Sequence, residues 1–243
     1  MLYLVGIGLD KNDVSLKGIE AIKKCKLVYV DTYTSDLPCS IRELEKIIGS
    51  KVIKADRKLL EEKDDIIACA KKTNVALLVP GDPLAATTHI DLVLRARKKK
   101  IKVEIIHSTS VFTAIAETGL QLYKFGKTAS IPKWQPSYRP ESFYDIIKEN
   151  LKIDAHTLLL LDIGLDIPTA LSQIKKIAEN RKDSGMLKRD VIICERTGTA
   201  NSKVVVGSLN KFLKKEFKSP YCIIIPSKLH FLEAEALKKF KKV

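Results

Sequence analysis

Short apolar segments alternate with amphipathic segments through residues 2–106, and no other feature of the sequence constrains the fold as strongly. The apolar segments have the length of strands, whereas the amphipathic segments carry apolar residues at helical spacing. The expected strands are Leu2–Ile7, Leu27–Asp31, Lys51–Ile53, Val75–Pro80 and Lys102–Ile106, and the expected helices are Ser15–Lys24, Ile41–Ile48, Asp64–Lys72 and Ala85–Lys99. This alternation predicts an α/β domain with a mainly parallel sheet that is covered by helices on both faces.

A proline-containing stretch, residues 133–141, has no apolar period and is expected to be a connection or an exposed loop. A second set of strands and helices follows it, and the polar residues 180–186 within that set predict a mobile loop. The strands are His156–Asp162, Asp190–Cys194, Lys203–Val206 and Tyr221–Pro226, and the helices are Phe143–Asn150, Pro168–Asn180, Leu209–Phe217 and His230–Lys241. We therefore expect an N-terminal α/β domain over residues 1–109 and a C-terminal α/β domain over residues 110–243.

The chain is basic, with 43 Lys and Arg against 29 Asp and Glu among 243 residues, a formal charge of +14. Such a surplus favours nucleic acid, an anionic membrane or an acidic protein partner. Aromatic residues do not interleave with the lysines as they do on a base-stacking surface. Two interpretations stay open: a solvated lysine-rich surface, or an electrostatic path toward a folded protein substrate.

Targeting and redox features point to the cytoplasm. The apolar runs are far shorter than the roughly 20 residues that cross a bilayer, and no basic leader precedes the first expected strand. The five cysteines are scattered, with no CxxC pair, and we expect reduced thiols that lie mostly in the core.

A Gly-x-Gly pattern, Gly6 and Gly8, leaves the first expected strand. A dinucleotide-binding fingerprint requires a third glycine three residues later, where Lys11 stands, so NAD binding is disfavoured. The glycines indicate either a close approach of the backbone to a ligand or a tight turn.

The segment from Pro80 to His89 follows another expected strand. Ligands of open parallel sheets collect at this end of the strands, and the two prolines around Gly81 and Asp82 predict a stiff bend that presents Asp82. The alternative is that Asp82 caps a helix that begins at Leu84 or Ala85.

The segment His107–Val111 follows the fifth expected strand and opens a helix, so its hydroxyls are expected near Asp82. His107 is either a packing residue at a strand end or a catalytic group. The sequence contains no HExxH, no phosphate-binding glycine loop with Lys-Ser/Thr and no cluster of His and Cys ligands, so a metal site and nucleotide hydrolysis are disfavoured.

Several longer motifs resemble one family from end to end. They are LYLVGIGL, CKLVYVDTYTS, VPGDPLAATTH, TGLQLYKFGKTASIP, HTLLLLDI and IIPSKLHFLEAEAL. Together they resemble the diphthine synthases, which belong to the tetrapyrrole-methylase-like class of S-adenosylmethionine-dependent methyltransferases. GDPL is typical of the broad class, whereas TTH, GLQLYKFGK and KLHFLEAEAL are specific to the family.

The resemblance implies a two-domain tetrapyrrole-methylase-like fold, a homodimer, and S-adenosyl-L-methionine bound in the cleft between the domains, with S-adenosyl-L-homocysteine as product. It implies no metal, no membrane and no direct contact with nucleic acid. The family's cofactor-binding positions fall on Leu9, Asp82, Ala85, Ser110, Val111, Leu161, Thr197 and His230. We interpret Asp82 as a residue of cofactor binding or loop support rather than as a general base, and no catalytic residue is assigned.

The implied reaction moves methyl groups successively to the amino group of an aminocarboxypropyl side chain on a histidine of translation elongation factor 2, during diphthamide biosynthesis. Two alternatives stay open. One is a methylase of the same fold that acts on ribosomal RNA or a tetrapyrrole, and the other is a basic binding module without catalytic activity.

Overall fold

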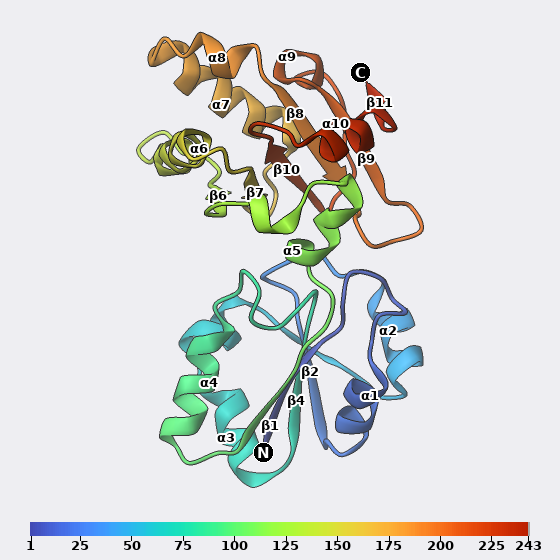
Figure 1. The fold of residues 1–243 in the computed structure, drawn as a ribbon. Coiled ribbons are helices and arrows are strands. Elements are labelled where there is room, and N and C mark those ends of the chain that lie inside the picture. The colour runs from blue at the N-terminus through green and yellow to red at the C-terminus, as the bar shows by residue number, and fades with distance from the viewer. Residues whose placement is uncertain (243) are drawn as a thin grey trace. The chain divides into compact units, whose positions relative to one another are not determined.

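The computed structural model describes residues 1–242 and divides into two α/β units (Figure 1). The first unit is Met1–Ala114, and the second begins at Ile115. The sequence-predicted domain boundary, between residues 109 and 110, falls just before the short helix α5 (Val111–Ala114), which closes the first unit.

The first unit contains a five-stranded parallel sheet in the order β3-β2-β4-β1-β5. The central strands β1 and β4 contain no charged residue, and every residue of both is buried, because helices cover both faces. The strands are β1 (Leu2–Gly6), β2 (Leu27–Asp31), β3 (Ile53–Ala55), β4 (Val75–Val79) and β5 (Val103–Ile106). The expected parallel sheet with helices on both faces is thus confirmed.

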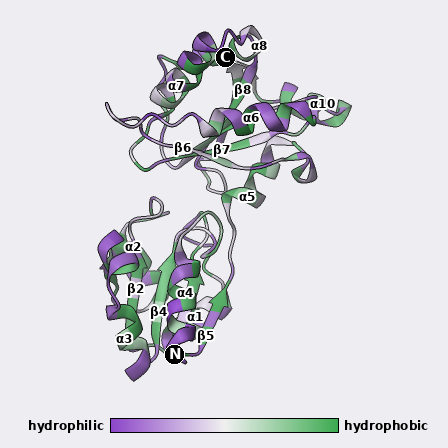
Figure 2. Cartoon of the chain, turned by 90° about the vertical axis from the view of Figure 1, so that its left-hand side faces the viewer, coloured by the Kyte–Doolittle hydropathy of each residue, from purple (hydrophilic) through white to green (hydrophobic). Residues whose placement is uncertain are grey.

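Two pairs of helices build the two core layers of this unit (Figures 1 and 2). One layer contains buried residues of α1 and α2, and the other contains buried residues of α3 and α4. A π-helical turn, η1, joins the second layer through Leu60. The helices are α1 (Leu16–Lys23), α2 (Ile41–Ile48), η1 (Lys58–Glu62), α3 (Asp65–Lys72) and α4 (His89–Lys98).

The second unit contains a mixed six-stranded sheet in the order β11-β9-β8-β10-β7-β6. Its strands are β6 (Ala129–Ile131), β7 (Thr157–Leu161), β8 (Asp190–Glu195), β9 (Lys203–Ser208), β10 (Tyr221–Ile225) and β11 (Lys241–Lys242). Strand β10 is antiparallel to both β7 and β8, so β7 and β8 run in the same direction.

One apolar core joins this sheet to its larger helices. The helical segments are η2 (Ile115–Thr118), η3 (Leu122–Lys124), α6 (Ser142–Lys152), α7 (Ile167–Asn180), α8 (Ser184–Leu187), α9 (Leu209–Phe212) and α10 (Phe231–Lys238). Phe143 and Tyr144 of α6 and Phe212 of α9 are among the largest fully buried side chains of the described residues.

Several expected elements differ from the observed ones. The third strand is Ile53–Ala55 rather than Lys51–Ile53, and α4 begins at His89 rather than at Ala85. The helix expected over Leu209–Phe217 ends at Phe212. Strand β6 has only three residues, and η1 has five of which three are charged, so both carry too little periodicity to be recognised.

Residues 180–186, expected as a mobile loop, connect α7 to α8 and contain one anchored side chain, Asp183. Asp183 accepts hydrogen bonds from the Tyr144 hydroxyl at 2.9 Å and from Lys148 Nζ at 2.6 Å, and its Oδ1 accepts from the amide of Met186 at 3.1 Å. Hydrogen bonds from Lys148 and Tyr144 hold the pKa of Asp183 below its usual value although burial raises it. The polarity of this segment therefore includes an anchoring carboxylate, and its mobility stays a prediction.

Candidate functional site

Three loops meet at the carboxyl end of the first sheet. They follow β1, β4 and β5, which are neighbours in the sheet and run in parallel, so their ends lie at one edge. The first two loops are joined directly, since the amide of Gly8 donates to the carbonyl of Gly81 at 3.1 Å and the amide of Gly81 donates to the carbonyl of Gly8 at 2.9 Å. The expected convergence of these loops is observed.

Asp13 fastens the first loop to the third. Its Oδ2 accepts hydrogen bonds from the amide of Leu9 at 3.0 Å, from the amide of Asp10 at 3.1 Å and from the Thr109 hydroxyl at 2.7 Å. The hydroxyl of Ser108 donates to the carbonyl of Asp13 at 3.3 Å. Asp13 therefore fixes the main chain at Leu9. Sequence reasoning missed this role, and the only local signal was an acidic residue shortly after the Gly-x-Gly turn.

The spaces beside Gly6 and Gly8 are filled by the protein itself. A Cβ on Gly6 would lie 2.8 Å from the carbonyl oxygen of Gly81 and 2.8 Å from the Cβ of Ser108. A Cβ on Gly8, where φ is +71°, would lie 2.1 Å from the Cβ of Asp13. The glycines are therefore required by the packing of loop against loop, which favours the tight-turn interpretation.

Asp82 connects the second loop to the third. Its Oδ1 accepts from the amide of Leu84 at 3.0 Å, and its Oδ2 accepts from the amide of Ser108 at 3.1 Å and lies 2.7 Å from Nδ1 of His107. Asp82 does not cap a helix, because α4 begins only at His89. The capping alternative is wrong, and the carboxylate supports the loops.

His107 is not a packing residue, because 68% of its side chain is exposed. Its ring is held by Asp82 alone among the described residues, at the edge of the three loops. The alternative role in catalysis stays a prediction.

The second loop has an unusual main-chain conformation. Ala86 has a φ of +57°, which costs roughly 1 kcal/mol or more in a residue with a Cβ. The Thr87 hydroxyl braces the loop through a 2.6 Å hydrogen bond to the carbonyl of Pro83. Backbone strain of this kind is concentrated at binding sites and active sites.

The five predicted cofactor residues of the first unit all lie on or beside these loops. Leu9, Ala85 and Val111 are half-buried, Ser110 is buried, and Asp82 is half-buried. The three loops thus offer apolar and small side chains at their surface, while the Asp13 and Asp82 carboxylates are engaged within the protein. Their contact with a cofactor stays a prediction.

The three predicted residues of the second unit are not all at one edge of its sheet. Leu161 ends β7 and Thr197 follows β8, and these strands run in the same direction. His230 instead follows β10, whose carboxyl end pairs with Thr157 at the start of β7. The shared role of these residues in cofactor binding also stays a prediction.

His230 is the N-cap of α10. Its Nδ1 accepts from the amide of Leu232 at 3.4 Å, and its amide donates to Glu233 at 2.7 Å, which completes a capping box. The ring is exposed and lies against the Phe231 ring, with centroids 4.2 Å apart.

Glu233 is fully buried and brings together the motifs GLQLYKFGK and KLHFLEAEAL. It accepts from the amide of Gln121 at 3.0 Å and from Lys124 Nζ at 2.5 Å, and Nε2 of His156 lies 3.0 Å away. Burial raises the pKa of Glu233, but the hydrogen bonds from Lys124, Gln121, His230 and His156 outweigh it and lower the pKa to about 2. The carboxylate therefore carries a charge in the folded protein at neutral pH.

Within the described residues, 1–242, no group of three or more His, Cys, Asp or Glu side chains is arranged to hold a metal ion. None of the helices described there is both long and apolar enough to span a membrane.

Residues 1–213 match the family model described as Tetrapyrrole (Corrin/Porphyrin) Methylases. A diphthine synthase of Methanococcus maripaludis is 43% identical, and the match covers 98% of this chain and 98% of that protein. A diphthine methyl ester synthase of Schizosaccharomyces pombe is 37% identical over 99% of this chain and 94% of that protein. A crystal structure of a diphthine synthase has a TM-score of 0.89 and 39% identity, and covers 100% of this chain and 96% of that chain.

The fold and the family match define the class: the chain is a methyltransferase of the tetrapyrrole methylase family. Within that class it belongs to the family of the diphthine synthases. The resemblance drawn from the sequence motifs is thereby confirmed.

Proposed function

We propose that this protein is a diphthine synthase that transfers methyl groups from S-adenosyl-L-methionine to the modified histidine of translation elongation factor 2. The acceptor is the amino group of the aminocarboxypropyl side chain on that histidine, and the methylations are successive. The observation that carries the proposal is the full-length likeness to diphthine synthases of Methanococcus maripaludis and Methanocaldococcus jannaschii and to a diphthine methyl ester synthase of Schizosaccharomyces pombe. The converging loops of the first unit support it, because they form an edge at which parallel sheets bind ligands.

The chain offers suitable groups for the donor. Adenine and a sulfonium are bound best by a dry, shaped surface with a few polar contacts. Leu9, Ala85 and Val111 supply small or apolar side chains, and the loops supply main-chain amides and carbonyls beside them. When bound, S-adenosyl-L-methionine supplies an activated methyl group on its sulfonium.

The protein's contribution to such a transfer is mainly positioning and desolvation. An amine lone pair attacks the methyl carbon in line while the positive charge of the sulfonium disappears, so alignment supplies most of the acceleration. The hydrogen bonds to Asp13 and Asp82 hold the three loops in one conformation before any ligand binds. The amine must also lose a proton between methylations.

The setting of the reaction belongs to the same proposal. The enzyme acts as a homodimer in the cytoplasm, on a folded protein partner and without direct contact with nucleic acid. The formal charge of +14 supports an electrostatic approach toward an acidic protein surface.

Incubation with methyl-labelled S-adenosyl-L-methionine and three separate acceptors tests the proposal. The acceptors are elongation factor 2 with the aminocarboxypropyl histidine, ribosomal RNA and a tetrapyrrole. We expect label only on the histidine of the factor, and label only on RNA or tetrapyrrole would refute the proposal. The unmodified factor is the matched control, since it lacks the amine.

Two further measurements sharpen the result. Calorimetry with S-adenosyl-L-homocysteine separates an enzyme from a basic binding module, because only the enzyme takes up this product specifically. Mass spectrometry after exhaustive reaction counts the methyl groups. The relatives carry two names, diphthine synthase and diphthine methyl ester synthase, so the count decides whether a methyl ester is formed.

A further inference from the structure

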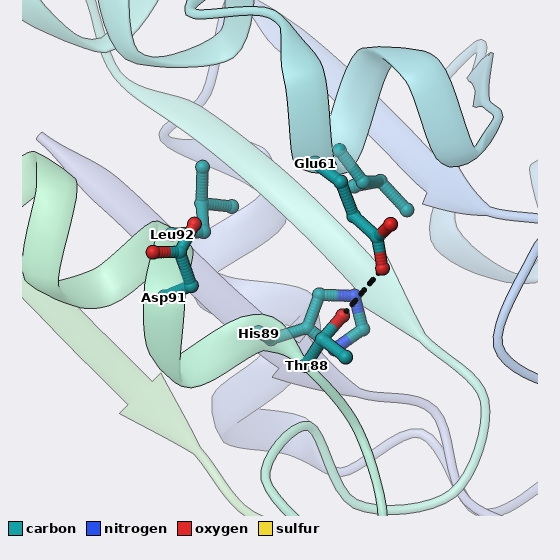
Figure 3. A pocket seen from close by; sticks show the side chains of 6 residues that line it. Glu61, Thr88, His89, Asp91 and Leu92 are labelled. Atoms are coloured by element: carbon teal, nitrogen blue, oxygen red, sulfur yellow. Dashed lines mark hydrogen bonds between the residues drawn. The ribbon is translucent and has the colours of Figure 1, made fainter.

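A pocket of about 220 Å³ lies in the first unit between η1 and the start of α4 (Figure 3). Leu60 and Leu92 provide apolar side chains, and the remaining lining residues are polar. They are Glu61, Thr88, His89 and Asp91. None of these residues is among the predicted cofactor positions, although Thr88 and His89 directly follow the loop that contains Asp82.

His89 is the buried member of this pocket and is only 2% exposed. Its Nε2 lies 3.3 Å from Oδ2 of Asp31, the last residue of β2. By hydrogen-bond geometry neither ring nitrogen has a partner among the described residues, and Nε2 faces the Asp31 carboxylate while Nδ1 faces no acceptor or donor of the protein. Buried polar atoms in proteins are almost always paired, so an unpaired ring nitrogen in the lining of a pocket indicates a place for a ligand.

Asp31 determines which hydrogen-bonding group His89 can offer. Asp31 is fully buried and also accepts from the amide of Tyr33 at 2.7 Å and from Thr34. Burial raises the pKa of Asp31, but the contact with His89 and the hydrogen bonds from Thr34 and Tyr33 outweigh it, so its pKa lies below the usual value. A carboxylate only accepts, so a proton on the nitrogen that faces it, Nε2, suits this arrangement and leaves Nδ1 as an acceptor for a ligand.

Glu61 and Thr88 add two further acceptors. The Thr88 hydroxyl lies 3.3 Å from Oε1 of Glu61 and donates its proton there, so its own lone pairs are free (Figure 3). The other carboxylate oxygen of Glu61 accepts from Arg57 at 2.8 Å. Asp91 is held by Arg95 at 2.7 Å. The groups that remain for a ligand are hydrogen-bond acceptors beside apolar side chains.

We propose that this pocket binds a protonated alkylamine through its N–H groups. The ammonium donates to Nδ1 of His89, to Glu61 and to Thr88, while the alkyl chain lies against Leu60 and Leu92. The inference rests on the proposed function in one respect: it identifies the ligand as the amino end of the acceptor side chain in its protonated form, which must lose a proton before its lone pair can attack the methyl carbon. Each N-methylation removes one N–H donor, so the pocket binds the unmethylated amine in preference to the trimethylated product.

Small amines test the pocket without any enzymatic turnover. The chain has four histidines, so the ring signals of His89 can be followed by NMR. The probes are n-butylammonium, butyltrimethylammonium and n-butanol at constant ionic strength, at up to about 100 mM because a ligand of this size binds weakly. We expect a saturable shift of the His89 signals with n-butylammonium and at least about tenfold weaker binding of the other two probes, which lack the N–H donors or the charge.

A matched pair of variants locates the binding. Glu61→Gln keeps the shape of the side chain but removes its charge, and we expect about tenfold weaker binding of n-butylammonium. Glu62→Gln makes the same charge change at the next residue, which is exposed and does not line the pocket, and we expect no change. Equal binding of all three probes, no saturable shift, or equal effects of the two variants would overturn the proposal.

Kinetics then connect the pocket to the reaction. With the modified elongation factor as acceptor, Glu61→Gln is expected to raise KM for the acceptor and to leave the Kd of S-adenosyl-L-homocysteine unchanged. An unchanged KM would overturn the identification of the ligand with the acceptor amine. If the wild-type protein binds n-butylammonium but does not methylate the factor, the proposed function fails while the pocket stands.

Discussion

Replacement of Asp82 by alanine should loosen the three loops and not merely remove a ligand contact. The carboxylate accepts hydrogen bonds from the amides of Leu84 and Ser108 and lies beside Nδ1 of His107. In the Asp82→Ala variant both amides lose their partner, and the link between the second and third loops is broken.

The size of the effect follows from these contacts. A hydrogen bond from an amide to a charged acceptor contributes about 1.5–3 kcal/mol. The Asp82 side chain is 13% exposed, so in the variant water can replace part of the lost hydrogen bonding to the two amides. The contact with the exposed His107 ring contributes little to stability. We expect the free energy of opening these loops to fall by about 3 kcal/mol, which corresponds to roughly a hundredfold faster amide exchange.

Native-state hydrogen exchange by NMR measures this loss residue by residue. Tryptophan fluorescence is unsuitable, because the single tryptophan, Trp134, lies in the second unit. The control is Asp36→Ala, which removes an exposed aspartate of the same unit and should leave exchange unchanged. If the amides of Leu84 and Ser108 exchange as in the wild type while affinity for S-adenosyl-L-homocysteine falls, Asp82 acts on the ligand directly and our reasoning about loop support is wrong.

Two further predictions concern packing and pH. Gly8→Ala should lower the free energy of unfolding by more than about 2 kcal/mol, because a Cβ there would lie 2.1 Å from the Cβ of Asp13. Gly164→Ala is the control and should lower it by only about 1 kcal/mol, because φ is +76° there but nothing lies within 4 Å of the added Cβ. Thermal or urea unfolding measures both changes. Glu233 has its pKa lowered to about 2, so the stability that it contributes is present above its usual pKa near 4.5 and is lost as the pH falls toward 2. Acid titration followed by circular dichroism should show this loss in the wild type and a flatter profile between pH 4.5 and 2 in Glu233→Gln, and identical profiles would contradict the assignment.

Sequence periodicity was sufficient for the central strands β1 and β4 of the first sheet because they are apolar and buried on both faces, whereas the short, largely exposed edge strand β3 was predicted two residues too early. Runs such as Val75–Val79 have no other stable environment than a sheet between two helical layers. The start of α4 was placed too early because Leu84 and Ala85 favour helix locally. Asp82 accepts from the amide of Leu84, and the conformation of Ala86 keeps the chain out of the helix until His89.

The sequence predicted those parts of the candidate site that directly follow a strand. It did not predict the contacts between side chains that lie far apart in the sequence. The loops with Gly8, Asp82 and Ser108 were identified because each follows an apolar run. The pairing of Asp31 with His89 was not, since each residue is unremarkable in its own segment and only the sheet order β2-β4 brings them together. The role of Asp13 was missed for the same reason.

Carboxylates that accept main-chain hydrogen bonds connect the loops to one another, and one such carboxylate, that of Asp31, lies beside the pocket residue His89. Main-chain amides in loops have no strand or helix partner, and one carboxylate can accept several of them. Asp13 and Asp82 are used in this way, so the loop atoms are positioned in advance and little ordering is needed when a ligand binds. Asp31 accepts from its own loop and faces His89, neither of whose ring nitrogens has a hydrogen-bond partner. Among the buried side-chain atoms of the described first unit, the unpaired ones therefore belong to a residue that lines the pocket, which is why we place the proposed ligand there.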